Sequence, residues 1–138
     1  MQFKNIFLLI GFAAIITINS CVKDRAALPP AVSTTLPSNC DTTNVTYTNS
    51  IGTIMTTYCN SGGACHNNTG HGTPYNFTTY AGVFANMNNG SNSIYYRVFI
   101  EASNSSLHMP NSISTGPQSL SVCDAAKLKA WINKGGPQ

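Results

Sequence analysis

Segment 46–59 carries four apolar side chains at helical spacing: Ile51, Ile54, Met55 and Tyr58. Thr48 or Asn49 precedes them and is available as an N-cap, because a short polar side chain can accept a hydrogen bond from a free N–H of the first turn. The pattern predicts a short amphipathic helix that ends at Cys59.

Segment 77–87 places four further apolar side chains on one helical face: Tyr80, Val83, Phe84 and Met87. The polar stretch 88–92 ends this second predicted helix. Segment 93–103 is ambiguous, since its β-branched and aromatic content favours a strand, whereas Ile94, Val98 and Glu101 continue a helical pattern. No partner strand is visible, so we predict a helix.

Segment 121–137 contains the clearest element. Ser121 followed by Asp124 predicts a capping box, and Gly135 and Gly136 predict where the helix stops. The predicted buried face consists of Val122, Ala125, Leu128, Trp131 and Ile132. Segments 59–75 and 104–118 have no period and are predicted loops. The fold class is therefore all-α: a small domain of three to four short helices with long loops.

Residues 1–20 have a different pattern, with Lys4 followed by an apolar run over 6–18. The run is too short to span a bilayer comfortably, so it predicts a signal peptide. The sequence "ITINSC" resembles the lipobox of bacterial lipoproteins, which implies cleavage before Cys21 and a diacylglycerol on its thiol. A secreted protein with a stray cysteine is the alternative. The resemblance implies a lipoprotein anchored to a membrane of the bacterial cell envelope, facing the periplasm or the cell surface.

Residues 21–39 are predicted to be a lipidated cysteine and a flexible tether: the lipobox resemblance implies the lipid on Cys21, and the following segment is proline-rich and has no period. The predicted domain then covers 40–138, with four basic and three acidic residues. A net charge this close to zero argues against nucleic acid and gives no polybasic membrane patch.

Export places the cysteines where disulfides persist. Without Cys21 the chain has four: Cys40, Cys59, Cys65 and Cys123. Either Cys59 and Cys65 hold a cofactor while Cys40 pairs with Cys123, or two disulfides form. Both allocations share the bridge from Cys40 to Cys123, which closes a long loop and ties the domain's entrance to its last helix. Connectivity does not follow from the sequence alone.

The stretch "CNSGGACH" has the form of a covalent haem site, in which two cysteines end in Cys-His, but five residues separate the cysteines instead of two. Gly62 and Gly63 offer a way for the longer gap to bulge outward. Met109, in the predicted loop and followed by a proline, is the candidate for a second iron ligand. His108 is the alternative candidate for the second iron ligand.

The order of helix, Cys...Cys-His, "FTTYAGV", Met-Pro and "LSVCDAAKLKAWINKGGP" resembles the small class I cytochrome c domains of exported bacterial lipoproteins. The resemblance implies one covalent haem c held by Cys59 and Cys65, with His66 and Met109 as iron ligands. It also implies that Trp131 packs on the first helix, and that Cys40 meets Cys123. The implied function is a lipid-anchored electron carrier that serves envelope redox proteins. We expect the haem edge to be enclosed by Tyr58, Phe77, Tyr80, Phe84, Phe99 and Trp131.

Two other interpretations stay open. A haem-free binding or structural module would pair Cys59 with Cys65 as a local disulfide. A metal clip would use Cys59, Cys65, His66 and His71 for zinc, or His108 and Met109 for copper. Enzymatic activity is not expected, because the domain has three acids and lacks both a Ser-His-Asp spacing and a phosphate loop.

Overall fold

The computed structural model describes residues 35–61, 65–67, 70, 74–88 and 90–138. The predicted signal peptide, the lipidation site at Cys21 and most of the tether lie outside these residues. Within them the chain forms helices and no strand, which confirms the all-α class. None of the helices in these residues is both long and apolar enough to cross a membrane.

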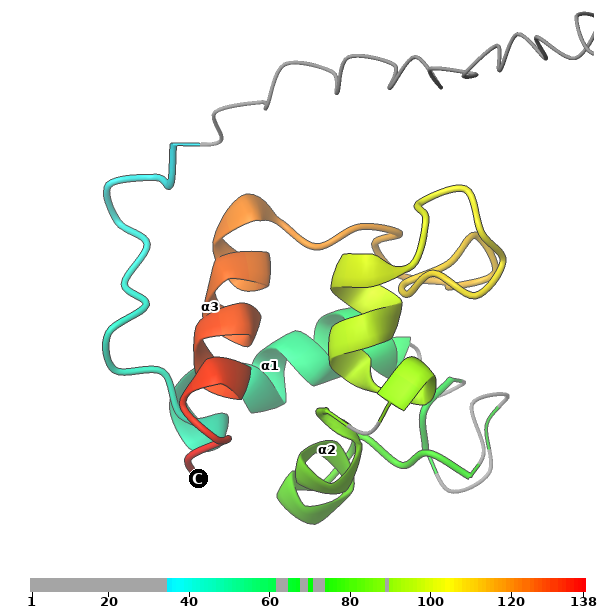
Figure 1. Cartoon of the computed structure of the whole chain (residues 1–138), viewed down its shortest axis with the longest axis horizontal. Coiled ribbons are helices and arrows are strands. Elements are labelled where there is room, and N and C mark those ends of the chain that lie inside the picture. The colour runs from blue at the N-terminus through cyan, green and yellow to red at the C-terminus, as the bar shows by residue number, and fades with distance from the viewer. Residues whose placement is uncertain (1–34, 62–64, 68–69, 71–73, 89) are drawn as a thin grey trace, which may run out of the picture. The chain divides into compact units, whose positions relative to one another are not determined.

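The first helix runs without interruption from Tyr47 to Cys59 and has three parts (Figure 1). These are η1 (Tyr47–Ile51), α1 (Gly52–Ile54) and η2 (Met55–Cys59), where η1 and η2 are π-helical. Its N-cap is Thr46, so the predicted cap at Thr48 or Asn49 is wrong. The Thr46 hydroxyl accepts from the Asn49 N–H at 3.2 Å, and the Asn49 side chain accepts from the Thr46 N–H at 2.9 Å. This reciprocal pair satisfies two N–H groups at once, whereas a later cap would leave them free.

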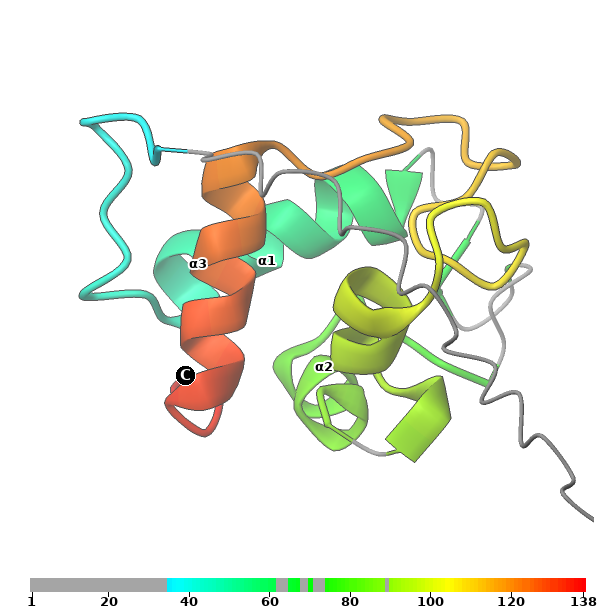
Figure 2. The same cartoon turned by 45° about the horizontal axis from the view of Figure 1, so that its top comes forward.

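Helix α3 (Val122–Asn133) crosses the first helix in both views, and its C-terminal half supplies much of the core (Figures 1 and 2). Trp131 and Leu128 are fully buried in the same cluster as Ile51 and Met55. The Trp131 indole N–H donates to the Pro137 carbonyl at 2.7 Å. A buried indole needs such an acceptor. The expected packing of Trp131 near the first helix is therefore present.

The predicted capping box of α3 is only half formed. The Ser121 hydroxyl accepts from the Asp124 N–H at 3.1 Å, but the Ser121 N–H donates to the Tyr58 hydroxyl at 3.3 Å instead of to Asp124. The Asp124 carboxylate accepts from the hydroxyls of Ser121 and Tyr58, at 2.7 and 2.8 Å. These bonds turn Asp124 toward the first helix. Val122, two positions earlier, is consequently 43% exposed, and its predicted burial is wrong.

Three shorter elements complete the domain: α2 (Tyr80–Asn86), the 3₁₀ turn η4 (Gly90–Asn92) and the π-helical η5 (Tyr96–Ile100). Segment 93–103 is thus helical as predicted, over a shorter span. Phe84 is 42% exposed, so only part of the predicted apolar face of α2 is buried. Gly135 and Gly136 end α3 as predicted, with φ of 78° and 71°.

A disulfide joins Cys40 to Cys123, whose Cα atoms are 5.6 Å apart and whose positions in the sequence differ by 83. Closing a loop of this length stabilises a fold by about 4 kcal/mol through the unfolded chain's entropy. At the other end of α3, the Lys134 ammonium donates to the carbonyls of Thr42 and Thr43. The entry segment is therefore fastened along α3 at two places.

Candidate functional site

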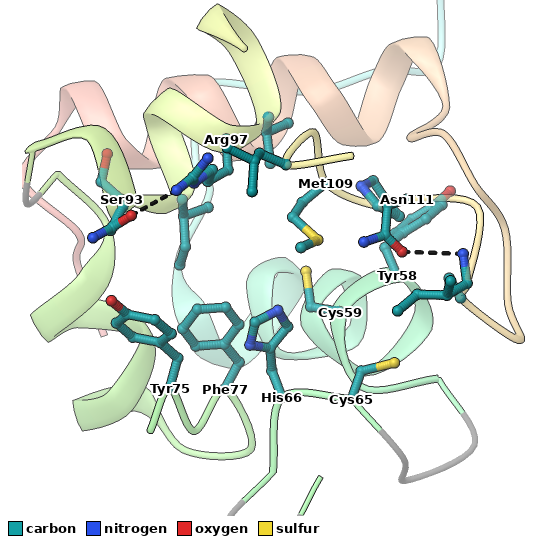
Figure 3. Close-up of a pocket in the computed structure, with 17 residues that line it drawn as sticks. Tyr58, Cys59, Cys65, His66, Tyr75, Phe77, Ser93, Arg97, Met109 and Asn111 are labelled. Carbon is teal, nitrogen blue, oxygen red and sulfur yellow. Dashed lines mark hydrogen bonds between the residues drawn. The ribbon is translucent and has the colours of Figure 1, made fainter. Parts of the chain in front are cut away.

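A cavity of about 250 Å³, partly open to solvent, lies between four segments that are far apart in sequence (Figure 3). The end of η2, with residues 65, 66, 75 and 77, forms one side. Helix η5, with the residues just before it, and the loop 107–114 form the other. All four cofactor residues expected from the sequence line it: Cys59, Cys65, His66 and Met109.

Cys59 is the last residue of η2, and its thiol is directed into the cavity (Figure 3). The side chain is buried and forms no disulfide. Burial, together with the nearby Cys65, raises the pKa of the Cys59 thiol to about 12. The sulfur therefore stays protonated at neutral pH, which protects it from thiol chemistry that needs a thiolate.

The chain returns on itself after Cys59, because the His66 N–H donates to the Cys59 carbonyl at 3.1 Å. Residues 59 and 66 are thus close together, and Cys65 lines the same cavity as Cys59. Cys65 is half-buried and is also a free thiol. Gly62 and Gly63, which were expected to form the bulge, lie outside the described residues.

His66 is held by both its backbone and its ring. Its carbonyl accepts from the Phe77 N–H at 2.8 Å. The imidazole stacks on the Phe77 ring, with centroids 4.5 Å apart and planes 24° apart. The Tyr75 ring lies 6.5 Å away at a tilt. These contacts fix the imidazole at the cavity wall (Figure 3).

Met109 enters the cavity from the opposite side, with its sulfur pointing inward (Figure 3). Its N–H donates to the Arg97 carbonyl at 3.0 Å, which ties the loop to η5. His108 is not among the residues that line the cavity. Its ring Nδ1 lies 3.2 Å from the Glu101 carbonyl instead. Of the two neighbours, Met109 is the one placed to reach a bound group.

The expected aromatic wall is only partly correct. Tyr58 and Phe77 line the cavity, whereas Tyr80, Phe84, Phe99 and Trp131 do not. Helical periodicity shows which residues share a face but not whether that face meets the core or a cavity, and Trp131 lies in the core. Sequence reasoning missed several lining residues: Tyr75, Ile94, Val98, Leu107 and Ile113. The spacing of Ile94 and Val98 was the available signal, since residues four apart share a helical face.

Arg97 is the one charged side chain among the described lining residues. Its guanidinium forms an ion pair with Glu101 at 3.2 Å and donates to the Asn92 side chain at 2.6 Å. The positive charge is thus compensated locally, and the cavity carries little net charge.

The described residues contain no cluster of three or more His, Cys, Asp or Glu side chains arranged to hold a metal ion. His71, the fourth ligand of the metal clip, lies outside them. Searches against protein-family models, curated proteins and solved structures found no match to this chain.

Proposed function

We propose that this chain is a lipid-anchored electron carrier of the bacterial cell envelope, with one covalent haem c in a cytochrome c-like domain. One observation carries the proposal. Two thiols, an imidazole and a thioether, spread over positions 59 to 109, all line one cavity. These side chains are the ones that covalent haem attachment and two axial iron bonds require.

The residues present fit that group. Cys59 and Cys65 would hold it by thioether bonds, and His66 and Met109, on opposite sides of the cavity, would bind its iron. Haem, when bound, supplies a one-electron iron couple. The protein's part is to bind and orient it, and to exclude water with a largely apolar wall that includes Phe77, Ile94 and Val98.

The size of the cavity supports a partly exposed group. At about 250 Å³ it falls just below the roughly 300 to 1,000 Å³ of typical small-molecule sites. A porphyrin seated here would therefore leave an edge at the open side. Leu107 and Ile113, at 51% and 72% exposed, border this opening. An exposed edge beside uncharged side chains suits contact with another envelope redox protein.

The proposal also includes the lipid anchor and the expectation that this chain catalyses no reaction. A lipid on Cys21 would keep the domain near membrane-bound partners and raise their effective concentration. If His66 and Met109 both bound the iron, they would leave no place for a substrate at the metal. We therefore propose electron transfer and no catalysis by this chain alone.

The test is to produce the mature chain together with a cytochrome maturation system, denature it, and measure haem that stays with the polypeptide. We expect one haem per chain. Cys59→Ala and Cys65→Ala should each leave a single thioether, and the double variant should retain none. The paired variant Cys40→Ala with Cys123→Ala is the control for the loss of two sulfur atoms, because neither residue lines the cavity. It should keep one covalent haem per chain although it unfolds more easily.

A colourless protein whose peptides show Cys59 joined to Cys65 would contradict the electron-carrier proposal. It would favour the second candidate, a haem-free module on the same helical scaffold. That candidate is supported by the closeness of both thiols to one cavity and by a core in which Trp131 and Leu128 are buried among the protein's own side chains.

A further inference from the structure

The loop that carries Met109 is fastened to η5 by two hydrogen bonds. The Met109 N–H donates to the Arg97 carbonyl at 3.0 Å, and His108 Nδ1 lies 3.2 Å from the Glu101 carbonyl. A carbonyl oxygen only accepts, so Nδ1 carries the hydrogen and donates. Both acceptors belong to the last turn and C-cap of η5, where carbonyl groups need partners from outside the helix.

The second of these bonds is the one made by a side chain. Other hydrogen bonds of the loop either stay within it, such as that from the His108 N–H to the Ser105 carbonyl at 3.1 Å, or join its far end to Ser61 through the hydroxyls of Ser114 and Thr115. Leu107, on the other side of His108, is 51% exposed and adds little packing. The His108 ring therefore anchors the backbone immediately before Met109.

An anchor matters here because methionine is unbranched and has three rotatable side-chain bonds. The position of its sulfur depends on how firmly the backbone is held. One hydrogen bond fixes a single point of the loop, whereas two bonds from consecutive residues also restrict its rotation. The Met109 sulfur is then directed into the cavity in a narrower range of positions.

We propose that His108 is a positioning residue that holds Met109 in place to bind the haem iron. This inference rests on the proposed function. It assigns different work to two adjacent side chains: the Met109 sulfur binds the cofactor, and the His108 ring fastens the loop to η5.

Two substitutions separate the hydrogen bond from the ring itself. Asparagine carries its NH₂ on Cγ, where histidine carries Nδ1, so His108→Asn keeps a donor near the same place. Glutamine carries its NH₂ one atom farther out, so His108→Gln keeps polarity and loses the geometry. His108→Leu removes the donor altogether.

The measurement is imidazole binding to the oxidised haem-loaded protein, because imidazole competes with Met109 for the iron. We expect His108→Gln and His108→Leu to bind imidazole about fivefold more tightly than the unaltered chain, the effect of one neutral hydrogen bond. His108→Asn should stay within about twofold. Met109→Ala sets the upper limit of affinity.

Equal imidazole affinities for the unaltered chain, His108→Gln and His108→Leu, beside a much tighter Met109→Ala, would overturn the positioning role and leave the carrier intact. If no form retains haem, the electron-carrier proposal is wrong. Hydrogen exchange at the Met109 amide of the haem-free chain then tests whether the His108 ring holds the backbone at Met109. Faster exchange in His108→Gln than in His108→Asn supports it. Equal rates overturn it.

Discussion

The two ends of the first helix are held in different ways. At its start, the Tyr47 and Thr48 N–H groups donate to the carbonyls of Pro137 and Gln138, at 2.9 and 3.2 Å. Trp131 donates to the same Pro137 carbonyl, so the C-terminal segment is clamped between the two crossing helices. At its other end, Cys59 borders a cavity whose walls come from loops and from η5.

The difference separates stability from binding. The first end is closed by hydrogen bonds between parts of the protein. The second end contains a buried thiol, a stacked imidazole and a thioether around open space. Substitutions at the first end should therefore change the free energy of unfolding. Substitutions at the second end should mainly change binding of a group in the cavity.

The largest loss of stability should follow removal of the disulfide. Cys40→Ala with Cys123→Ala should lower the free energy of unfolding by about 4 kcal/mol, because the unfolded chain regains the entropy of its long loop. Urea denaturation of the haem-free chain measures it. Cys65→Ala, which removes an unbonded thiol, is the control. A comparable loss in both would mean that the disulfide contributes no more to stability than an unbonded thiol at the cavity.

The next effect is a pH dependence at the cavity end. The Cys59 thiol has its pKa raised to about 12 from 9.0, so the folded chain keeps a proton that the unfolded chain loses between these values. Stability should be unaffected below pH 9 and fall as pH rises from there to about 12, by at most about 1.4 kcal/mol per pH unit.

Tyrosine and lysine side chains titrate in the same range, so the informative quantity is a difference. Denaturation of the haem-free chain and of Cys59→Ala should give stabilities that converge as pH increases above 9. Parallel curves would show that burial of this thiol does not govern the slope.

A smaller loss of stability is expected where the cavity end of the first helix meets the start of α3. Tyr58→Phe removes the hydroxyl that donates to Asp124 and accepts from the Ser121 N–H. The loss should be about 1.5 kcal/mol, since one partner is charged and partly buried. Tyr75→Phe is the matched control, because Tyr75 also lines the cavity and its hydroxyl makes no hydrogen bond to the described residues. Equal losses would mean that the hydrogen bonds at Tyr58 contribute nothing.

The smallest change in stability should come from Met109→Leu, a substitution that nearly conserves volume and should cost less than about 1.5 kcal/mol. In the oxidised, haem-loaded protein it should nevertheless abolish the weak sulfur-to-iron absorption band. Denaturation and visible spectroscopy on the same sample separate the two effects. A band that survives would assign the iron ligand to another residue.

The closed end was largely predictable from the sequence, because its signals are local or few. Ser121 and the paired glycines bracket α3, and the even cysteine count pointed to Cys40 with Cys123. The predictions of the two helix caps failed because the hydrogen-bond partner was a residue that the usual cap pattern does not include. Asn49 served as the third residue of a capping box usually completed by Glu or Gln, and Tyr58 took the Ser121 N–H from Asp124.

The cavity end was less predictable, because its walls come from segments that meet only in the fold. The Cys-His pair and Met109 could be proposed by resemblance. The same resemblance favoured Met109 over His108, but the bond between the His108 ring and the Glu101 carbonyl of η5 could be found only in the fold. The aromatic wall was misassigned because Trp131 and Phe84 carry the same helical signal as residues that do face the cavity.

The 83-position span of the disulfide has a consequence for assembly. A chain that crosses a membrane with its N-terminus first delivers Cys40, Cys59 and Cys65 before Cys123 emerges. During that interval, the early cysteines can react only with one another, and the wrong pair would have to be exchanged later. Prompt occupation of Cys59 and Cys65 would leave Cys40 a single possible partner. The timing of cofactor attachment would then determine the fidelity of oxidative folding.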